Sequence, residues 1–387
     1  MAMHPNAENA LRARFKKVIE KADISAGNLA KTLDWTELNP LAEQLAKLKS
    51  EFITSSDAVS LIYDYVYSLI PPENQISAPL TDLILSKEEV TENFIQLINE
   101  IPFKIKVSFP LPRLAVGLFN GARVSETEWF EIKKLKNKTS NIMEDCVYFT
   151  TIVEGYWGDS FDSPTPRESL ARLKISIQFL FSDDVVMPTR HSVAGIVFEE
   201  PASQMDALVE YTVLGRPVST KTELPQTINE FAYFLRRSPK NFFEQTRKTD
   251  QFKERLEPSL LRLSRFLSTT NPHSKRVKAA AEWHIDALAN HSDTMALIQS
   301  CIALESLYGD DSSNGGLTET LADRCAYSLA TTHAERAKIK AEFKEIYRLR
   351  SKIVHGVVNN LKPEETSHLR HAKRLLIASI KKESGLL

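Results

Sequence analysis

The sequence contains few cysteines and no long apolar run. Its three cysteines, Cys146, Cys301 and Cys325, lie far apart without a CxxC pair, which argues against a disulfide scaffold or a thiolate zinc site and favours a reducing compartment. No apolar run approaches the ~20 residues that a membrane helix needs, and residues 1–21 lack the hydrophobic region of a secretory signal. We therefore expect a cytoplasmic protein with no membrane partner.

The motifs of common nucleotide-binding and hydrolase sites are also missing. The sequence has no GxGxxG, no GxxxxGK[ST] and no GxSxG, so neither a nucleotide-binding loop nor a serine hydrolase triad is supported. His368 and His371, and also His284 and His291, have spacings that could hold a metal, but no carboxylate or cysteine completes either pair. We therefore interpret them as chance surface histidines and expect no metal and no cofactor.

The composition is ordinary for a globular protein, but the charge is unevenly distributed. The 387 residues exceed the size of a single core, and 42% hydrophobic with 26% charged residues exclude wholesale disorder. From Pro225 to the C-terminal end there are 26 basic and 19 acidic side chains, a net charge of +7, against −8 for residues 1–224. A polyanionic partner is therefore expected at the C-terminal part, the alternative being a solvated basic helix surface.

The period of the apolar residues changes twice along the chain. We predict three regions, which are a helical N-terminal region (1–101), a β-rich middle region that could be a sensor (102–224) and a helical C-terminal bundle (225–387). In the first region Leu11, Phe15 and Val18 have helical spacing, and the Ile-Pro-Pro at 70–72 must end a helix. The expected fold class is a multidomain α+β protein.

Alternating apolar and polar residues predict the strands of the middle region. The segments with this period are 103–109, 146–157, 173–181, 193–200 and 207–214. Turns rich in proline, glycine and aspartate separate them, and one helical turn could begin at Pro166. Strands joined by turns without regular helices between them predict an antiparallel sheet.

Helical spacing returns after Pro225. The predicted segments are 226–236, 251–267, 275–289, 294–308, 317–330, 334–354 and 363–382. The last one begins at Pro363, because a proline followed by two glutamates favours a first helical turn. Short connections and the lack of a solenoid repeat predict an antiparallel helical bundle.

One helix of this bundle ends in residues that can do chemistry. Arg350 interrupts an otherwise apolar helical stripe, and a guanidinium near a buried face needs an anionic partner. His355 follows five residues later and precedes Gly356, the residue type that ends helices in a left-handed conformation. Five residues separate two side chains on a regular helix by about 140°. Arg350 and His355 can therefore converge only if the helix ends at His355 or if a second subunit contributes.

An imidazole beside a guanidinium suits phosphodiester chemistry. Histidine exchanges a proton near neutral pH, and an adjacent arginine binds a phosphate and the charge that develops on it. We therefore take Arg350 and His355 as the candidate catalytic pair. The candidate substrate-binding residues flank them in the sequence and are Tyr347, Arg348, Ser351 and Lys352. The alternatives are a solvated helix face for Arg348 and Lys352 and a core position for Tyr347.

Three motifs of the C-terminal region resemble a known superfamily. The run Tyr347–Gly356 (YRLRSKIVHG) is similar to the R-x4-6-H signature of the HEPN superfamily. Upstream, Ala303–Tyr308 (ALESLY) and Leu317–Tyr327 (LTETLADRCAY) resemble the ALE-L and L-x-x-R-x-A helices of its Apea-like branch. The resemblance covers roughly residues 250–387 and rests on three motifs in the right order.

The resemblance implies a helical bundle that forms a homodimer, joins two Arg/His pairs in one cleft and cleaves RNA without a metal. His355 would assist deprotonation of the ribose 2′-hydroxyl or protonate the leaving oxygen, and Arg350 would bind the scissile phosphate. The products would end in 2′,3′-cyclic phosphate and 5′-hydroxyl groups, and DNA would resist because it lacks the 2′-hydroxyl. Many catalytic members carry Asn, Asp or His directly after the arginine, where this chain has Ser351.

Proteins of this branch often act in bacterial defence against phage, as toxic ribonucleases with an attached sensing region. By this resemblance, the N-terminal ~220 residues would sense a trigger such as a phage component and restrain the ribonuclease.

Two alternatives to a ribonuclease stay open. In the first, His355 caps helix carbonyls and Arg350 pairs with a bundle carboxylate such as Glu305, so that the bundle is a non-catalytic dimerisation or RNA-binding module. In the second, the bundle partners a nucleotidyltransferase, for which this chain itself contains no motif.

Overall fold

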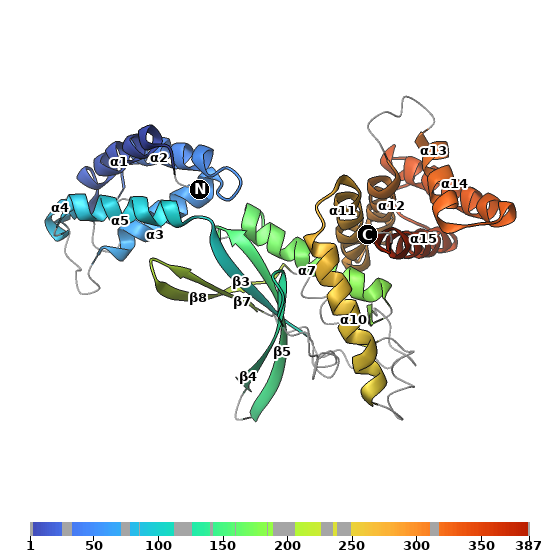
Figure 1. Ribbon diagram of the computed structural model, residues 1–387. Helices are drawn as coiled ribbons and strands as arrows, with labels where there is room; N and C mark the ends of the chain where they lie inside the picture. Colours follow the sequence, from blue (N-terminus) through green and yellow to red (C-terminus); the bar gives the residue numbers. More distant parts are fainter. Residues whose placement is uncertain are drawn as a thin grey trace. The chain divides into compact units, whose positions relative to one another are not determined.

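Helices come first, strands follow in the middle of the chain and helices return at the C-terminal end, as the sequence predicts, although one long helix lies within the middle region (Figure 1). The computed structural model describes residues 3–24, 33–70, 78–84, 86–111, 126–139, 142–158, 160–183, 185–188, 206–225, 235–237, 249–309 and 317–385. The expected mixture of helices with an antiparallel sheet in the middle of the chain is therefore confirmed.

The chain divides into two compact units. One comprises Met1–Val107, Ile152–Leu170 and Leu208–Lys221, and the other comprises Ser108–Thr151, Ala171–Ala207 and Thr222–Leu387.

The N-terminal region is helical, as predicted. Its elements are α1 (Pro5–Glu20), α2 (Trp35–Leu48), α3 (Ser55–Ser68), α4 (Leu80–Leu83) and α5 (Lys87–Glu100), with a short ladder of β1 (Asp23–Ile24) and β2 (Ala78–Pro79). Helix α1 packs against α2 and α5, and the stacked rings of Phe15 and Phe94 have centroids 3.9 Å apart. Helix α3 ends at Ser68, just before the two prolines that were expected to stop it.

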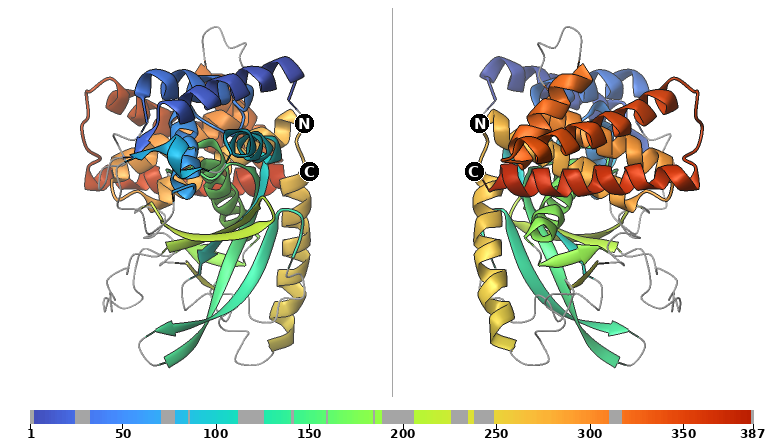
Figure 2. Two further views of the ribbon diagram at one scale, coloured as in Figure 1. Left: turned by 90° about the vertical axis from the view of Figure 1, so that its left-hand side faces the viewer. Right: turned by 90° about the vertical axis from the view of Figure 1, so that its right-hand side faces the viewer.

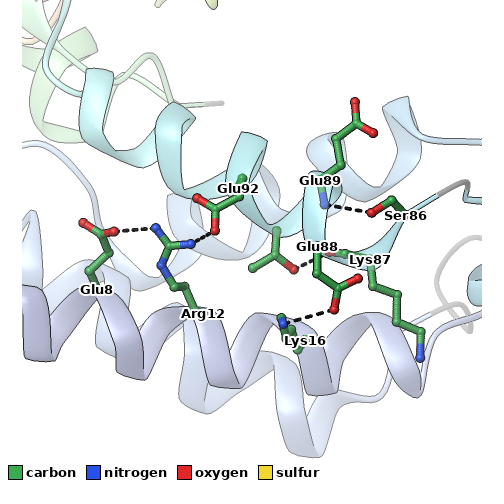
Figure 3. A network of polar contacts seen from close by, with 9 residues as sticks. Glu8, Arg12, Lys16, Ser86, Lys87, Glu88, Glu89 and Glu92 are labelled. Carbon is green, nitrogen blue, oxygen red and sulfur yellow. Dashed lines mark hydrogen bonds and ion pairs between the residues drawn. The ribbon is translucent and has the colours of Figure 1, made fainter.

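Ion pairs join α1 to α5 along their surface (Figure 3). Arg12 of α1 contacts Glu8 and also Glu92 of α5, and Lys16 Nζ lies 3.4 Å from Glu88 Oε1. Such exposed pairs contribute only about 0–1 kcal/mol each. The buried aromatic contact between the two helices is therefore the stronger contribution to their packing.

The middle region contains a five-stranded sheet. Its strands are β3 (Phe103–Pro110), β4 (Phe130–Thr139), β5 (Ile142–Gly155), β7 (Asp206–Val213) and β8 (Arg216–Glu223), in the order β4-β5-β3-β7-β8. The strands predicted at 103–109, 146–157 and 207–214 are confirmed, whereas the segment 193–200 lies outside the described residues. Leu214 and Gly215 join β7 to β8 with positive φ angles of 47° and 75°, as a tight hairpin turn requires.

One predicted strand is wrong. Residues 173–181 belong to α7 (Pro164–Ser182), which is buried along most of its length. Three polar side chains, Lys174, Ser176 and Gln178, create the alternation, and all three are buried. Lys174 pairs with Asp286, Ser176 Oγ donates to the Arg172 carbonyl, and Gln178 Nε2 donates to Ser182 Oγ. A helix that is buried all round does not show an amphipathic period, so the pattern was misleading.

The helix predicted at 226–236 is wrong at the residues that the structure describes. Residues 226–234 lie outside the described part, but Leu235–Arg237 forms strand β9, which pairs with β6 (Val186–Pro188). A strand here pairs with a segment about 50 residues earlier, which local periodicity does not reveal.

The remaining C-terminal helices are confirmed. They are α10 (Thr249–Ser268), α11 (Pro272–Ala289), α12 (Asp293–Tyr308), α13 (Leu317–Leu329), α14 (His333–Val354) and α15 (Thr366–Ser384), with the 3₁₀ turn η2 (Pro363–Glu365) before the last. Asn271 caps α11, and Thr332 forms a capping box with Glu335 at the start of α14. Helices α14 and α15 lie side by side (Figure 2). Glu342 of α14 pairs with Arg374 of α15. None of the described helices is long and apolar enough to cross a membrane.

The second half of α7 packs against helices of the C-terminal region. The rings of Phe179 and Phe266 have centroids 5.4 Å apart, and Lys174 Nζ lies 2.8 Å from Asp286 Oδ1 on α11. This half of α7 therefore shares a core with α10 and α11.

Candidate functional site

Helix α14 ends at the candidate catalytic histidine. His355 is the C-cap residue, and Gly356 follows with a φ angle of +70°. The Gly356 N–H donates to the Ile353 carbonyl at 3.0 Å, and the Val357 N–H donates to the Lys352 carbonyl at 2.8 Å. This pair of bonds is the Schellman arrangement, which needs a left-handed residue after the cap. The prediction that the helix ends at His355 because of Gly356 is confirmed.

Arg350 is half-buried and paired with a carboxylate of α12. Its Nη2 atom lies 3.4 Å from Glu305 Oε1, and 32% of the arginine side chain and 27% of the glutamate side chain are exposed. The Nε atom of Arg350 is buried and has no hydrogen-bond partner among the described residues. The guanidinium therefore meets Glu305 on one side and offers its remaining exposed part to solvent.

His355 is exposed on the surface at the end of the helix. Within the part of the chain that the structure describes, its imidazole makes no hydrogen bond or ion pair. Arg350 and His355 thus share the last turns of α14 but are not joined to each other. The backbone of His355, rather than its side chain, caps the helix, because its N–H donates to the Ser351 carbonyl.

Tyr347 is a core residue. Its side chain is buried, its ring stacks on Phe343 with centroids 4.6 Å apart, and its hydroxyl donates to the Cys301 carbonyl of α12 at 3.1 Å. Burial raises the pKa of the Tyr347 phenol, and the neighbouring Cys301 and Glu305 raise it further. In this arrangement the ring is not presented to an RNA base.

The other candidate contacts lie on the surface. Arg348 Nη2 is 2.7 Å from Glu345 Oε2, while Ser351 is exposed and Lys352 is half-buried. Arg348 lowers the pKa of the Glu345 carboxyl, with smaller contributions from His368 and Lys352. Arg348 therefore contacts this carboxylate, while Lys352 and His368 of α15 act on it electrostatically.

His368 is the residue of this surface that the sequence did not assign to it. His368 belongs to none of the three motifs, and its spacing to His371 suggested only a chance pair. No group of three or more metal-ligating side chains is present among the described residues. The proximity of His368 to Glu345 depends on how α15 packs on α14, which the sequence does not show.

The three motifs of the C-terminal region contact one another. Glu305 of the first motif pairs with Arg350 of the third. Arg324 of the second motif donates through Nη1 to the carbonyl of Tyr308, the last residue of the first motif, at 2.6 Å. Both other motifs are therefore bonded to helix α12, which is itself buried along most of its length.

The cysteines of this bundle are buried beside the same helices. Cys301 and Cys325 are fully buried free thiols, and burial raises the pKa of each to about 12. They are therefore not candidates for nucleophiles at neutral pH.

Comparisons of the chain with protein-family models, with curated proteins and with solved structures find no match. The resemblance to the HEPN superfamily therefore stays a prediction.

Proposed function

We propose that the chain is a HEPN-like, metal-independent endoribonuclease whose catalytic residues are Arg350 and His355. The observation that supports this most is the end of α14. The Schellman turn at Gly356 leaves the His355 imidazole exposed and uncommitted, one and a half turns after a guanidinium that Glu305 holds in place. A free imidazole and an oriented cation are the two groups that cleavage of a ribose phosphodiester requires.

The proposed reaction is an internal transfer of the phosphate. The ribose 2′-oxygen attacks the phosphorus, the bond to the 5′-oxygen of the next nucleotide breaks, and a 2′,3′-cyclic phosphate forms. His355 accepts the proton of the 2′-hydroxyl or gives a proton to the leaving 5′-oxygen, and water or the second His355 exchanges the other proton, so that one proton is removed and one is added in each cleavage. Arg350 binds the non-bridging oxygens, on which negative charge increases in the transition state.

A homodimer would supply the second pair of catalytic residues. Arg350 and His355 are not joined within one chain, and two apolar side chains are exposed nearby, Val354 at the end of α14 (52%) and Val357 in the turn after it (71%). Exposed apolar groups next to a polar site favour a protein interface. Two copies that meet through this end of α14 would place both imidazoles beside one RNA strand.

We further propose a biological setting from the same resemblance. The enzyme would act in the cytoplasm as a toxic effector of anti-phage defence, with residues 1–224 sensing a phage-derived trigger and restraining cleavage.

The second candidate is a non-catalytic dimerisation or RNA-binding module. The ion pair between Arg350 and Glu305 favours it, because this is the pairing expected of a structural arginine. A half-buried pair of this kind contributes about 1 kcal/mol when it is measured by a double-mutant cycle. If stabilisation is the whole role of this ion pair, removing either side chain should change the free energy of unfolding and leave the other properties of the protein unchanged.

Cleavage of single-stranded RNA by the purified chain in EDTA separates the two candidates. We expect His355→Ala to lower the rate about 10²- to 10⁴-fold and Arg350→Ala to lower it about 10²- to 10³-fold, with cyclic phosphate ends in the wild-type products. His333→Ala is the matched control, because His333 is exposed at the opposite end of the same helix. Sequencing RNA ends in cells that express wild type or His355→Ala, with and without phage infection, tests for a trigger.

Equal RNA ends in both strains, infected and uninfected, would exclude the ribonuclease. A double-mutant cycle of Arg350→Ala and Glu305→Ala that gives the coupling energy above, without any cleavage, would establish the structural module.

A further inference from the structure

A cationic surface lies near the N-terminal end of α14. Two adjoining hollows of about 800 Å³ and about 470 Å³ share Tyr327, Ser328 and Glu383 in their linings. They form where the end of α13, the first turn of α14, the last turn of α15 and the first turns of α11 meet. We call this the basic hollow and define it by Arg276, Arg324, Tyr327, Arg336, Lys381 and Lys382.

The charge of the basic hollow is strongly positive. Among the described residues that line it, five are arginine or lysine and only Glu383 is acidic. The Glu383 carboxylate is already engaged: Ser328 Oγ donates to it at 2.5 Å, and His273 Nε2 lies 3.4 Å from it. Arg276 and Lys382 have no ion pair within the described residues, so their charges are available to an anion.

An exposed aromatic ring lies among these cations. Tyr327 is 64% exposed, and the Arg336 guanidinium lies over one face of its ring at 4.2 Å from the centroid. Arg336 is itself fixed, because its Nε donates to the Ala330 carbonyl at 3.0 Å. One face of the tyrosine ring is thus held by a cation, and the other is a platform on which a planar group can stack.

We propose that the basic hollow binds a nucleotide unit of single-stranded RNA, with a base stacked on Tyr327 and phosphates on the surrounding cations. Stacking platforms among positive charges are the common means of holding single strands without reading their sequence. The two hollows have the size of ordinary ligand pockets, about 300–1,000 Å³. A free nucleotide offers the same base and phosphate, so it is the other source of this ligand.

This site is separate from the proposed catalytic pair. Arg336 and Arg350 are fourteen residues apart on one helix, about 21 Å along its axis. Binding at the basic hollow needs no cleavage, so it can be tested after catalysis has been removed.

The test uses the full chain with His355→Ala in every sample, so that RNA stays intact whether or not the ribonuclease proposal holds. Fluorescence anisotropy with a labelled single-stranded oligouridylate of about ten nucleotides measures binding, and adenosine 5′-monophosphate is the free-nucleotide arm. Arg276→Glu is compared with Lys275→Glu, since the neighbouring lysine is exposed but does not line the hollow. Tyr327→Ala is compared with Tyr327→Phe, which keeps the ring.

We expect Tyr327→Ala to weaken RNA binding about 5- to 150-fold, the range for loss of one stacked base, while Tyr327→Phe changes it little. Arg276→Glu should weaken binding about tenfold and Lys275→Glu less than about threefold. Competition by adenosine monophosphate at similar concentrations would identify a free nucleotide as the ligand, and no competition would identify the strand.

The proposal is overturned if neither RNA nor nucleotide binds, if Tyr327→Ala binds as tightly as Tyr327→Phe, or if the two charge reversals have equal effects. Circular dichroism of each variant confirms that these surface changes leave the fold intact.

Discussion

The guanidinium of Arg350 has nitrogens in different surroundings. Nη2 faces Glu305, whereas Nε is buried and has no hydrogen-bond partner in the described part of the chain. A buried, unpaired donor on a charged group costs free energy, so the sequence keeps this arginine at a stability cost. A phosphate that binds the exposed part of the side chain would give the guanidinium a second anionic partner beside Glu305. Such a residue therefore suits a phosphodiester site.

The expectation that His284 lies on the surface is wrong, because this histidine is packed between α11 and α7. It is fully buried on α11, its ring stacks on Phe181, and its Nδ1 lies 2.6 Å from Gln178 Oε1 on α7. Burial, with a smaller contribution from Lys373, lowers the pKa of His284 to about 3. The imidazole is therefore neutral in the folded protein, with its Nε2 unpaired among the described residues.

His284 should make the protein less stable in mild acid. In the unfolded chain a histidine has a pKa near 6.5, so between about 6.5 and about 3 the unfolded state binds a proton that the folded state does not. The free energy of unfolding should therefore fall as pH decreases below about 6.5, by at most about 1.4 kcal/mol per pH unit. His284→Asn keeps a donor toward Gln178 without this proton, so its stability deficit relative to wild type should shrink from pH 7 to pH 5.

Urea unfolding at a series of pH values measures this effect. His333→Asn is the exposed control, and its curve should run parallel to that of wild type. A curve for His284→Asn that also runs parallel would show that His284 is not the group responsible.

The end of α14 is an element whose geometry depends on one glycine. Gly356 has a φ angle of +70°, and a Cβ atom placed there would meet no atom within 4 Å. The requirement for glycine is therefore one of backbone conformation and not of space.

Substituting Gly356 should loosen this helix end and reduce cleavage. We expect Gly356→Val to lower the free energy of unfolding by about 1–2 kcal/mol and Gly356→Asn by less, because asparagine tolerates the left-handed conformation better. RNA cleavage should fall in the same order, since His355 directly precedes the turn. Thermal unfolding and cleavage assays on both variants test this, and equal values for the two would contradict it.

The sequence predicts helix ends well and buried elements poorly. The end of α14 follows from His355 and Gly356, and the end of α3 follows from the prolines after it, because caps and breakers act on their own neighbours. Helix α7 was missed because Ser176 and Gln178 are satisfied by partners inside the core, which local periodicity does not reveal.

The sequence names residues for the candidate site, but it does not give their contacts. The pairing of Arg350 with Glu305 was expected only as one alternative, and the position of His368 was not expected. Both depend on how α12 and α15 pack against α14, and residues far apart in the sequence carry no local signal of such packing. The core position of Tyr347 follows from the apolar stripe on which it lies.

The molecule as a whole should form a dimer through the turn after α14. Replacing Val357 by Asp should prevent association and reduce cleavage strongly, because a charge would enter an apolar contact. Leu261→Asp is the control, since Leu261 is an exposed apolar residue of α10, 49% exposed. Sedimentation equilibrium measures the mass of both variants.

A dimer that persists in Val357→Asp, or is lost equally in Leu261→Asp, would place the interface elsewhere. If wild type is a monomer that cleaves RNA, the shared cleft is not needed.

The buried thiols of Cys301 and Cys325 give the C-terminal helices a built-in reporter of opening. A thiol with a pKa of about 12 is almost entirely protonated at pH 8, and no reagent reaches it while the helices stay packed. The rate at which these two cysteines are alkylated, followed by mass spectrometry over hours, would therefore measure how often the helices open, without any added label.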